Sequence, residues 1–176
     1  MAESMGHQSR FAFDATGAVF GAASKRIELL SESVRKTTAI LDTNGIRGTR
    51  QHAVERTRFG QNAVAGQITL NPSKNDFDFF LPYILGTAEV ADVFALGELP
   101  GAFDFKKDTG AAILRYNGLK VSKATLRGSA GGFVELVLDV PGKAEVEGET
   151  WEAGIPAIPV GTSDAPYVFT DTSTLT

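Results

Sequence analysis

The stretch AVAGQITLNPSKNDFDFFLPYILG, residues 63–86, contains both kinds of regular structure that the chain is expected to use. In its first half, Val64, Ile68 and Leu70 fall on one side of an extended chain, while Gln67 lies on the other. This alternation predicts a β-strand over residues 63–71 with one buried face. A buried face needs a cover, and the residues that follow are suited to provide it.

The second half of the stretch predicts an amphipathic helix. Ser73 can cap its first turn, Asp76 follows at the spacing of a capping box, and Gly86 stands where a left-handed residue often ends a helix. Pro82 removes one backbone hydrogen bond, so we expect a kink or an early end there. Apolar residues at positions i, i+3, i+4 and i+7 form a stripe that we expect to pack on the sheet: Phe77, Phe80, Leu81 and Ile84.

Short β-like runs lie on both sides of this stretch. They cover residues 10–14, 26–34 and 36–42 before it, and residues 92–97, 102–108 and 111–118 after it. Two longer runs, 119–128 and 133–140, are joined by the glycine-rich turn 129–132, which predicts a hairpin. A further strand-like run begins at Tyr167.

These patterns predict a mainly β protein, an antiparallel β-sandwich or partly closed barrel with one flanking amphipathic α-helix. A chain of 176 residues suits one domain. We therefore expect a single domain over residues 1–176, or the N-terminal part of a longer two-domain chain whose next segment begins near residue 167.

Charge is unevenly distributed along the chain. Residues 47–58 hold four arginines against Glu55, a local charge of +3, whereas residues 135–152 hold six acids against Lys143. The basic residues fall in a polar segment, 43–62, that is far longer than a hairpin connection of about two to five residues. Such a loop suits contact with an acidic surface of a partner. The alternative is a nucleic-acid-binding β module that uses residues 47–58 on phosphates, which the net charge of −4 disfavours.

The sequence gives little support for catalysis or for a cofactor. It has no cysteine, two histidines, and no HExxH, GxSxG or Walker pattern. Alternating acids at the end of the chain's acidic region suit an exposed surface better than a calcium site: Glu145, Glu147 and Glu149. We expect no enzyme, no metal and no cofactor. No apolar run is long enough to span a membrane and no secretory signal is present, so we expect synthesis in the cytoplasm and no membrane partner.

Several stretches, taken in order, resemble one protein family. They are IELLSES (27–33), TTAILDTNGIRGTRQHAVERTRFGQNAVAGQITLNPS (37–73), DFFLPYILG (78–86), LKVSKATLRGSAGGFVELVLDVPGKAE (119–145) and PYVFTD (166–171). Their order and spacing resemble the major tail tube proteins of long-tailed, non-contractile bacteriophages. The resemblance covers residues from about Ser9 to Thr170.

The resemblance implies a structural protein of the virion tail, made in the host bacterial cytoplasm. Its partners would be further copies of itself, other tail proteins and, in transit, the phage DNA. Stacked rings would form the tube, with six copies per ring, or three copies if the intact chain carries a second similar domain. The resemblance also places the long loop in contact with neighbouring subunits. The arginines of this loop are candidates for salt bridges to Glu145, Glu147 and Glu149 of a neighbouring subunit. They are Arg47, Arg50, Arg56 and Arg58.

Overall fold

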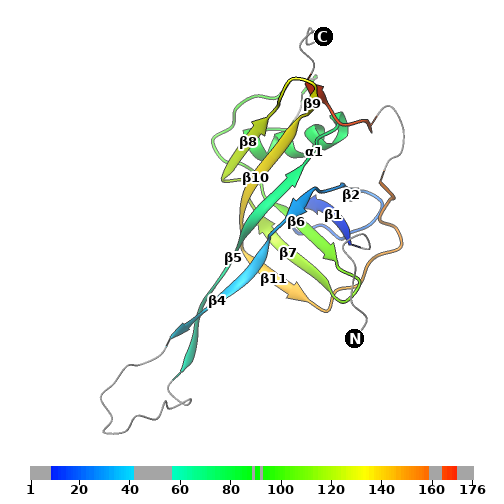
Figure 1. Ribbon diagram of the computed structural model, residues 1–176. Helices are drawn as coiled ribbons and strands as arrows, with labels where there is room; N and C mark the ends of the chain where they lie inside the picture. Colours follow the sequence, from blue (N-terminus) through cyan, green and yellow to red (C-terminus); the bar gives the residue numbers. More distant parts are fainter. Residues whose placement is uncertain (1–8, 42–56, 89, 92, 159–163, 170–176) are drawn as a thin grey trace.

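The structure, a computed structural model, describes residues 9–41, 57–88, 90–91, 93–158 and 164–169. These residues form two larger antiparallel sheets, a small third sheet and the helix α1 (Figure 1). The helix lies at one end of the body, and strands β4 and β5 extend together from the other end (Figure 1). The expected mainly β, antiparallel architecture with one helix is therefore confirmed for the described residues. Both larger sheets are open, so the described strands form no closed barrel.

The first sheet has five strands. Their order across the sheet is β11 (Ala144–Glu147), β7 (Ile113–Leu119), β6 (Phe103–Asp108), β1 (Arg10–Ala15) and β2 (Lys25–Arg26). The pairing of β1 with β6 is continuous, from Arg10 opposite Asp108 to Ala15 opposite Phe103. Strands far apart in the sequence thus form the centre of this sheet.

The second sheet is built around the long strand β5. Its order is β3 (Ser31–Glu32), β5 (Arg58–Leu70), β10 (Glu135–Gly142) and β8 (Lys123–Arg127), and β4 (Arg35–Leu41) also pairs with β5. Strands β8 and β10 pair antiparallel from Glu135 opposite Arg127, which confirms the expected hairpin. Its first strand, Lys123–Arg127, is shorter than the expected run 119–128. The third sheet pairs β9 (Gly132–Phe133) with β12 (Val168–Phe169).

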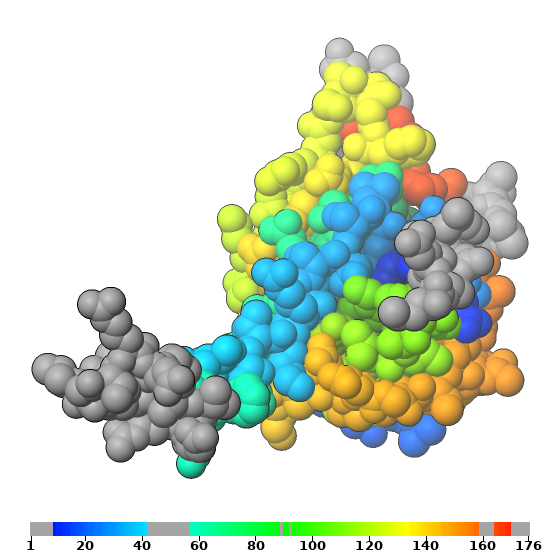
Figure 2. Space-filling view, turned by 60° about the horizontal axis from the view of Figure 1, so that its bottom comes forward, coloured from blue at the N-terminus to red at the C-terminus, as the bar shows by residue number. Residues whose placement is uncertain are grey.

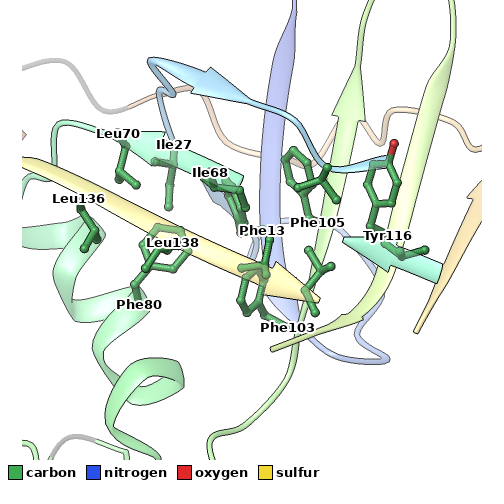
Figure 3. Packing of buried hydrophobic residues seen from close by; sticks show 14 residues of the cluster. Phe13, Ile27, Ile68, Leu70, Phe80, Phe103, Phe105, Tyr116, Leu136 and Leu138 are labelled. Carbon is green, nitrogen blue, oxygen red and sulfur yellow. The ribbon is translucent and has the colours of Figure 1, made fainter. Parts of the chain in front are cut away.

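The core lies between the two larger sheets and is closed by the helix (Figure 3). Phe13 of β1 stacks on Phe105 of β6 with ring centroids 4.9 Å apart and meets the edge of Phe80 at 5.4 Å. From the second sheet, Ile68 and Leu138 are fully buried in the same cluster. The face of β5 that the sequence predicted to be buried is indeed the one that meets this core.

Helix α1 (Lys74–Leu85) begins and ends as its sequence predicts. Ser73 and Asp76 form a capping box, and Gly86 is left-handed and donates its N–H to the carbonyl oxygen of Pro82 at 2.9 Å. Of the kink or early end considered at Pro82, the early end does not occur, because the helix continues to Leu85 with Pro82 inside it.

The helix packs on the sheets mainly through one fully buried ring. Phe80 is 0% exposed, and Phe77 and Ile84 are partly buried against the core cluster. Leu81 is half-buried and is not among the residues of that cluster. Phe79 takes a place there instead, with its ring 6.0 Å from that of Phe13. The face of the helix that meets the core is therefore rotated toward Phe79 relative to the predicted stripe.

Two of the expected strands differ in the structure, for identifiable reasons. The run 26–34 forms no single strand, because β2 pairs with β1 in the first sheet and β3 pairs with β5 in the second, so the chain passes from one sheet to the other between them. In the run 92–97, the described residues hold no strand beyond a single bridge between Val90 and Val93. This segment folds back on the helix instead, with the Gly97 N–H donating to the carbonyl of Leu85 at 2.7 Å.

Candidate assembly interface

The outer half of β5 leaves the body of the molecule. Strand β10 pairs with β5 only from Leu70 to Val64, and below Val64 the described part of β5 is paired with β4 alone. We call this two-stranded part, residues 37–41 with 58–63, the ribbon. Figures 1 and 2 show it projecting from the body. The expected loop 43–62 is therefore corrected in part, since residues 58–62 belong to a strand.

Direct contacts between residues of β4 and β5 hold the ribbon together. Thr38 donates its hydroxyl to Oδ1 of Asn62 at 2.7 Å, and the register shifts between Thr38 and Ile40. Such a bulge increases the local twist of a strand pair. Gly60 allows close contact across the pair, because a Cβ there would lie 3.1 Å from Cγ of Leu41.

The ribbon exposes large apolar side chains. Phe59 is 83% exposed, Ile40 68% and Leu41 59%, and all of β4 is exposed. A two-stranded hairpin is at best marginally stable alone, and clustered exposed apolar side chains mark interaction surfaces. The ribbon therefore combines a projecting two-stranded arrangement with exposed apolar side chains.

One of the four predicted arginines falls within the described residues. Arg58 is the first residue of β5, is exposed, and lies opposite Leu41 in the register. The remaining three lie outside the described residues: Arg47, Arg50 and Arg56. The structure thus places one predicted interface cation directly beside the apolar side chains of the ribbon.

The predicted acidic partners differ in their availability. Glu145 lies 3.8 Å from the ammonium of Lys36, and burial together with the hydrogen bond to Glu145 raises the pKa of Tyr116. Glu149 lies 3.0 Å from the ammonium of Lys106. Glu147 is exposed and forms no ion pair with any other described residue. Of the three acids, Glu147 alone can meet a neighbour without giving up a contact within its own subunit.

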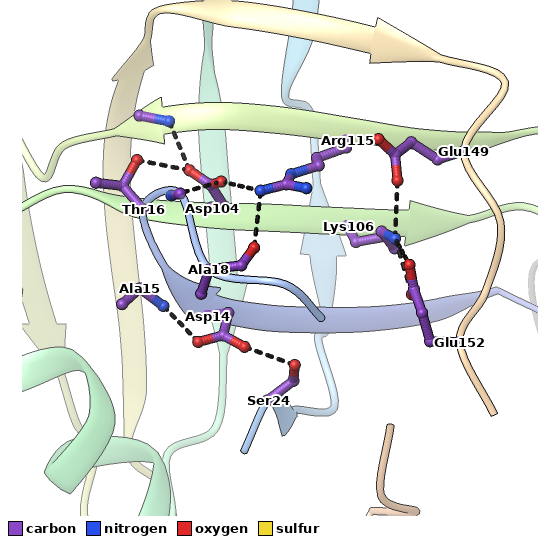
Figure 4. Close-up of polar contacts among 12 residues, drawn as sticks. Asp14, Ala15, Thr16, Ala18, Ser24, Asp104, Lys106, Arg115, Glu149 and Glu152 are labelled. Atoms are coloured by element: carbon purple, nitrogen blue, oxygen red, sulfur yellow. Dashed lines mark hydrogen bonds and ion pairs between the residues drawn. The ribbon is translucent and has the colours of Figure 1, made fainter. Parts of the chain in front are cut away.

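A polar cluster on the first sheet was not found from the sequence (Figure 4). Lys106 is 0% exposed, with its ammonium 3.0 Å from Glu149, 2.7 Å from Glu152 and 4.7 Å from the centre of the Phe20 ring. In the sequence, Lys106 alternates with phenylalanines as an outward-facing residue would. Its burial comes from distant segments, since Phe20 and Glu152 lie in the loops that cover it.

Asp104, two residues before Lys106, is the acidic centre of the same cluster. It accepts hydrogen bonds from Arg115 at 2.7 Å, from the N–H of Gly118 at 2.8 Å and from Thr16 at 2.8 Å. Burial alone would raise the pKa of Asp104, but these hydrogen bonds outweigh it and lower the pKa below the ordinary value of 3.8. The carboxylate of Asp104 is thus bonded within the subunit, and its contacts join the loop at Thr16 to the sheet.

A second exposed apolar surface lies beyond the helix, in residues 86–100, which we call the post-helix loop. Its exposed side chains include Leu96 (86%), Leu99 (79%), Val90 (73%) and Val93 (63%). The pattern of residues 92–97 predicts a strand, so the exposure of these side chains could not be predicted from the sequence.

The described residues show no grouping of acids and histidines able to hold a metal ion. None of their helices has the length and apolar character needed to cross a membrane.

Comparison with known proteins agrees with the family resemblance seen in the sequence. The model of the phage tail tube protein family matches residues 6–176. Among solved structures, the chain is similar to one from the sheath–tube complex of an extracellular contractile injection system (PVC), at 8% identity and a TM-score of 0.49 over 80% of this chain and 89% of that chain. It is also similar to the tube-terminating cap of the anti-feeding prophage, at 11% identity and a TM-score of 0.45 over 80% and 89%. No curated protein matches the chain.

Proposed function

Because the chain belongs to the phage tail tube protein family, we propose that its copies form rings that stack into the tube through which DNA passes during ejection. The family makes the protein a structural component of the virion tail. The observation that carries the finer proposal is the ribbon, with both strands exposed and Phe59 83% exposed at its far part. An isolated subunit gains nothing from displaying such a side chain, whereas an assembled one can bury it against a neighbour.

Contacts within a ring are supported by the open edge of the second sheet. In the order β3-β5-β10-β8, strand β8 is the last described strand, so its outer edge has no described strand beside it. Strand β8 is largely exposed, including Leu126 at 59%. Unpaired edges are ready sites for pairing with another chain. We infer that β8 meets the next subunit of the ring and continues the sheet across the boundary.

Contacts between rings are assigned to the ribbon and the basic segment beyond it. The arginines of this segment suit carboxylate partners, because a guanidinium can bind a carboxylate through two parallel hydrogen bonds. Among the three predicted acids, we favour Glu147, which is exposed. Glu145 and Glu149 would first have to leave Lys36 and Lys106.

For the ring itself, we propose six copies of this chain, each contributing one domain over residues 1–176. If the intact protein carries a second similar domain, three copies would supply the same number of domains. The mass of the assembled ring distinguishes these two arrangements.

The test is assembly of the purified chain. We expect rings or tubes in negative-stain micrographs, and a sedimentation coefficient that rises with protein concentration. A species that stays monomeric at high concentration and moderate salt would contradict the proposal. Binding to a labelled DNA duplex that weakens with added salt, without any assembly, would favour the nucleic-acid-binding module instead.

A further inference from the structure

The post-helix loop is held in a defined shape at its base. A Cβ at Gly97 would lie 2.5 Å from the carbonyl oxygen of Gly86, so the loop packs directly on the end of α1. The hydroxyl of Thr87 also donates to the carbonyl oxygen of Ala95. These contacts fix both ends of the segment against the helix, although its apolar side chains point to solvent.

The outer part of the loop is a tight turn. Val90 and Val93 exchange both backbone hydrogen bonds, at 3.0 and 3.1 Å, and between them Ala91 has φ of 52°. A left-handed backbone is unfavourable for alanine and is most often retained where the surroundings or a function require it. The turn displays both valines, which are 73% and 63% exposed.

The loop and the ribbon are complementary in charge as well as in apolar character. In the sequence, the post-helix loop contains Glu89, Asp92 and Glu98 and no basic residue, while the ribbon's Arg58 and the residues 42–57 that join its strands contribute four arginines against two acids. Within the described residues, Glu98 is exposed between Leu96 and Leu99, and Arg58 is exposed next to Phe59. Each surface therefore has an apolar centre flanked by a charge of opposite sign, the arrangement common in interfaces.

The two surfaces lie at opposite ends of the molecule. The post-helix loop packs on the end of α1, and Figure 1 shows α1 at the end of the body away from the projecting ribbon. They therefore cannot meet within one subunit. Two different patches that fit each other at opposite ends produce a head-to-tail contact, which propagates into stacks when it repeats.

We propose that the post-helix loop is the surface on which the ribbon of a second copy of this chain docks, with Phe59 of one copy against Leu96 and Leu99 of the other. The proposal deepens the assembly proposed above and rests on it. It assigns the apolar part of the contact between stacked rings to residues that the family match does not single out. Glu98 of one copy and Arg58 of the other then lie at the rim of the same contact.

The absence of cysteine from the sequence allows a direct test by cross-linking. We would prepare the variants Phe59→Cys and Leu96→Cys separately, mix them in equal amounts under assembly conditions, and oxidise. The expected product is a disulfide-linked dimer that requires both variants. The double variant F59C/L96C should instead give a ladder of longer multimers, because each copy then carries both halves of the contact.

The matched control pairs Phe59→Cys with Val19→Cys. Val19 is as exposed as Leu96, at 88%, but lies in a different loop. Equal dimer yields from the two mixtures, or tubes that form without any Phe59–Leu96 cross-link, would overturn the docking proposal and leave the tube function standing. If the wild-type chain forms no assembly at all, both proposals fall.

A second measurement does not depend on disulfide geometry. The double change Leu96→Ser and Leu99→Ser should raise the protein concentration needed for tube formation by about tenfold or more, while Val19→Ser should leave it unchanged. All these sites are exposed, so the melting temperature of each variant should match that of the wild type. An unchanged assembly threshold for the loop variant would overturn the proposal.

Discussion

Individual side chains of this protein include charged ones that folding buries and apolar ones that folding leaves exposed. Lys106 and Asp104 belong to the first kind, since each is almost fully buried and forms an ion pair with an oppositely charged residue of the same chain. Phe59 and Leu96 belong to the second, since they are large, apolar and more than four-fifths exposed. Charged side chains are thus buried and large apolar ones exposed at these positions, the reverse of the usual distribution in globular proteins.

At Asp104, we predict a stability loss that depends on pH. The change Asp104→Asn leaves the guanidinium of Arg115 without its carboxylate, which should cost about 3 kcal/mol at neutral pH. Because the pKa of Asp104 is lowered by folding, its contribution is present above the ordinary value of 3.8 and is lost as the pH falls through the lowered value. Urea unfolding of wild type and variant should therefore differ at pH 7 and converge in strong acid.

The control for this prediction is Glu147→Gln, which removes an exposed carboxylate. Its free energy of unfolding should match that of the wild type at pH 7. If the difference between wild type and Asp104→Asn stayed constant as the pH fell below about 3, the carboxylate of Asp104 would not be the group responsible.

At Phe80, we predict the largest loss of any single apolar truncation on the helix. Phe80 is fully buried and meets Phe13 and Phe103 edge-on, so Phe80→Ala should cost about 3–5 kcal/mol. Leu81→Ala, one residue along and only half-buried, should cost clearly less. Chemical denaturation of both variants measures the difference, and equal losses would mean that the helix packs in another orientation.

Among the elements, β5 belongs both to the body of the molecule and to the ribbon. Its inner half, from Val64 to Leu70, is paired on both sides and carries core residues. Its outer half has β4 as its only described partner and exposes its side chains. One strand thus serves as a central strand of the body and as half of the projecting ribbon.

The inner half and the helix could be predicted from the sequence because their signals are local. Alternation around Ile68 and the cap residues Ser73 and Gly86 need no information from elsewhere in the chain. The extension of β5 back to Arg58 could not, because Gly60 and the polar residues beside it do not alternate. Burial of Lys106 could not be predicted either, since it depends on loops far away in the sequence.

Where the chain crosses β5 at Gly66, between β3 and β4, we predict that only glycine is tolerated. A Cβ at Gly66 would lie 2.4 Å from Cα of Val34 and 2.5 Å from its N, and backbone atoms cannot move aside as a flexible side chain can. Gly66→Ala should therefore cost about 1–3 kcal/mol. Gly21→Ala is the matched control, because a Cβ there meets nothing closer than 4.0 Å. Equal stability of the two variants in chemical denaturation would show that the crossing can open without cost.

For the whole molecule, the relevant feature is that two of its exposed apolar surfaces, the ribbon and the post-helix loop, lie at opposite ends. The ribbon extends from one end, and the post-helix loop packs against α1 at the other (Figure 1). Three of the six acids in residues 135–152, by contrast, form ion pairs with lysines of the same subunit: Glu145, Glu149 and Glu152. Opposite ends with complementary surfaces favour growth along one axis, which is the direction in which a tube lengthens.

The last prediction concerns the charge of the basic segment. Replacing Arg56 and Arg58 with glutamate should abolish stacking, because the segment would then repel the acids of a neighbour instead of attracting them. The melting temperature should stay within about 2 °C of the wild type, since exposed charges contribute little to the stability of the folded state.

The control for this prediction is the double variant Lys120→Glu with Lys143→Glu, which changes the net charge equally at exposed sites outside the ribbon. Tubes of normal length from the arginine variant, seen by negative-stain microscopy, would exclude electrostatic docking of this segment. Loss of tubes in both variants would instead assign the effect to net charge, because a more negative subunit repels its copies wherever the charge is placed.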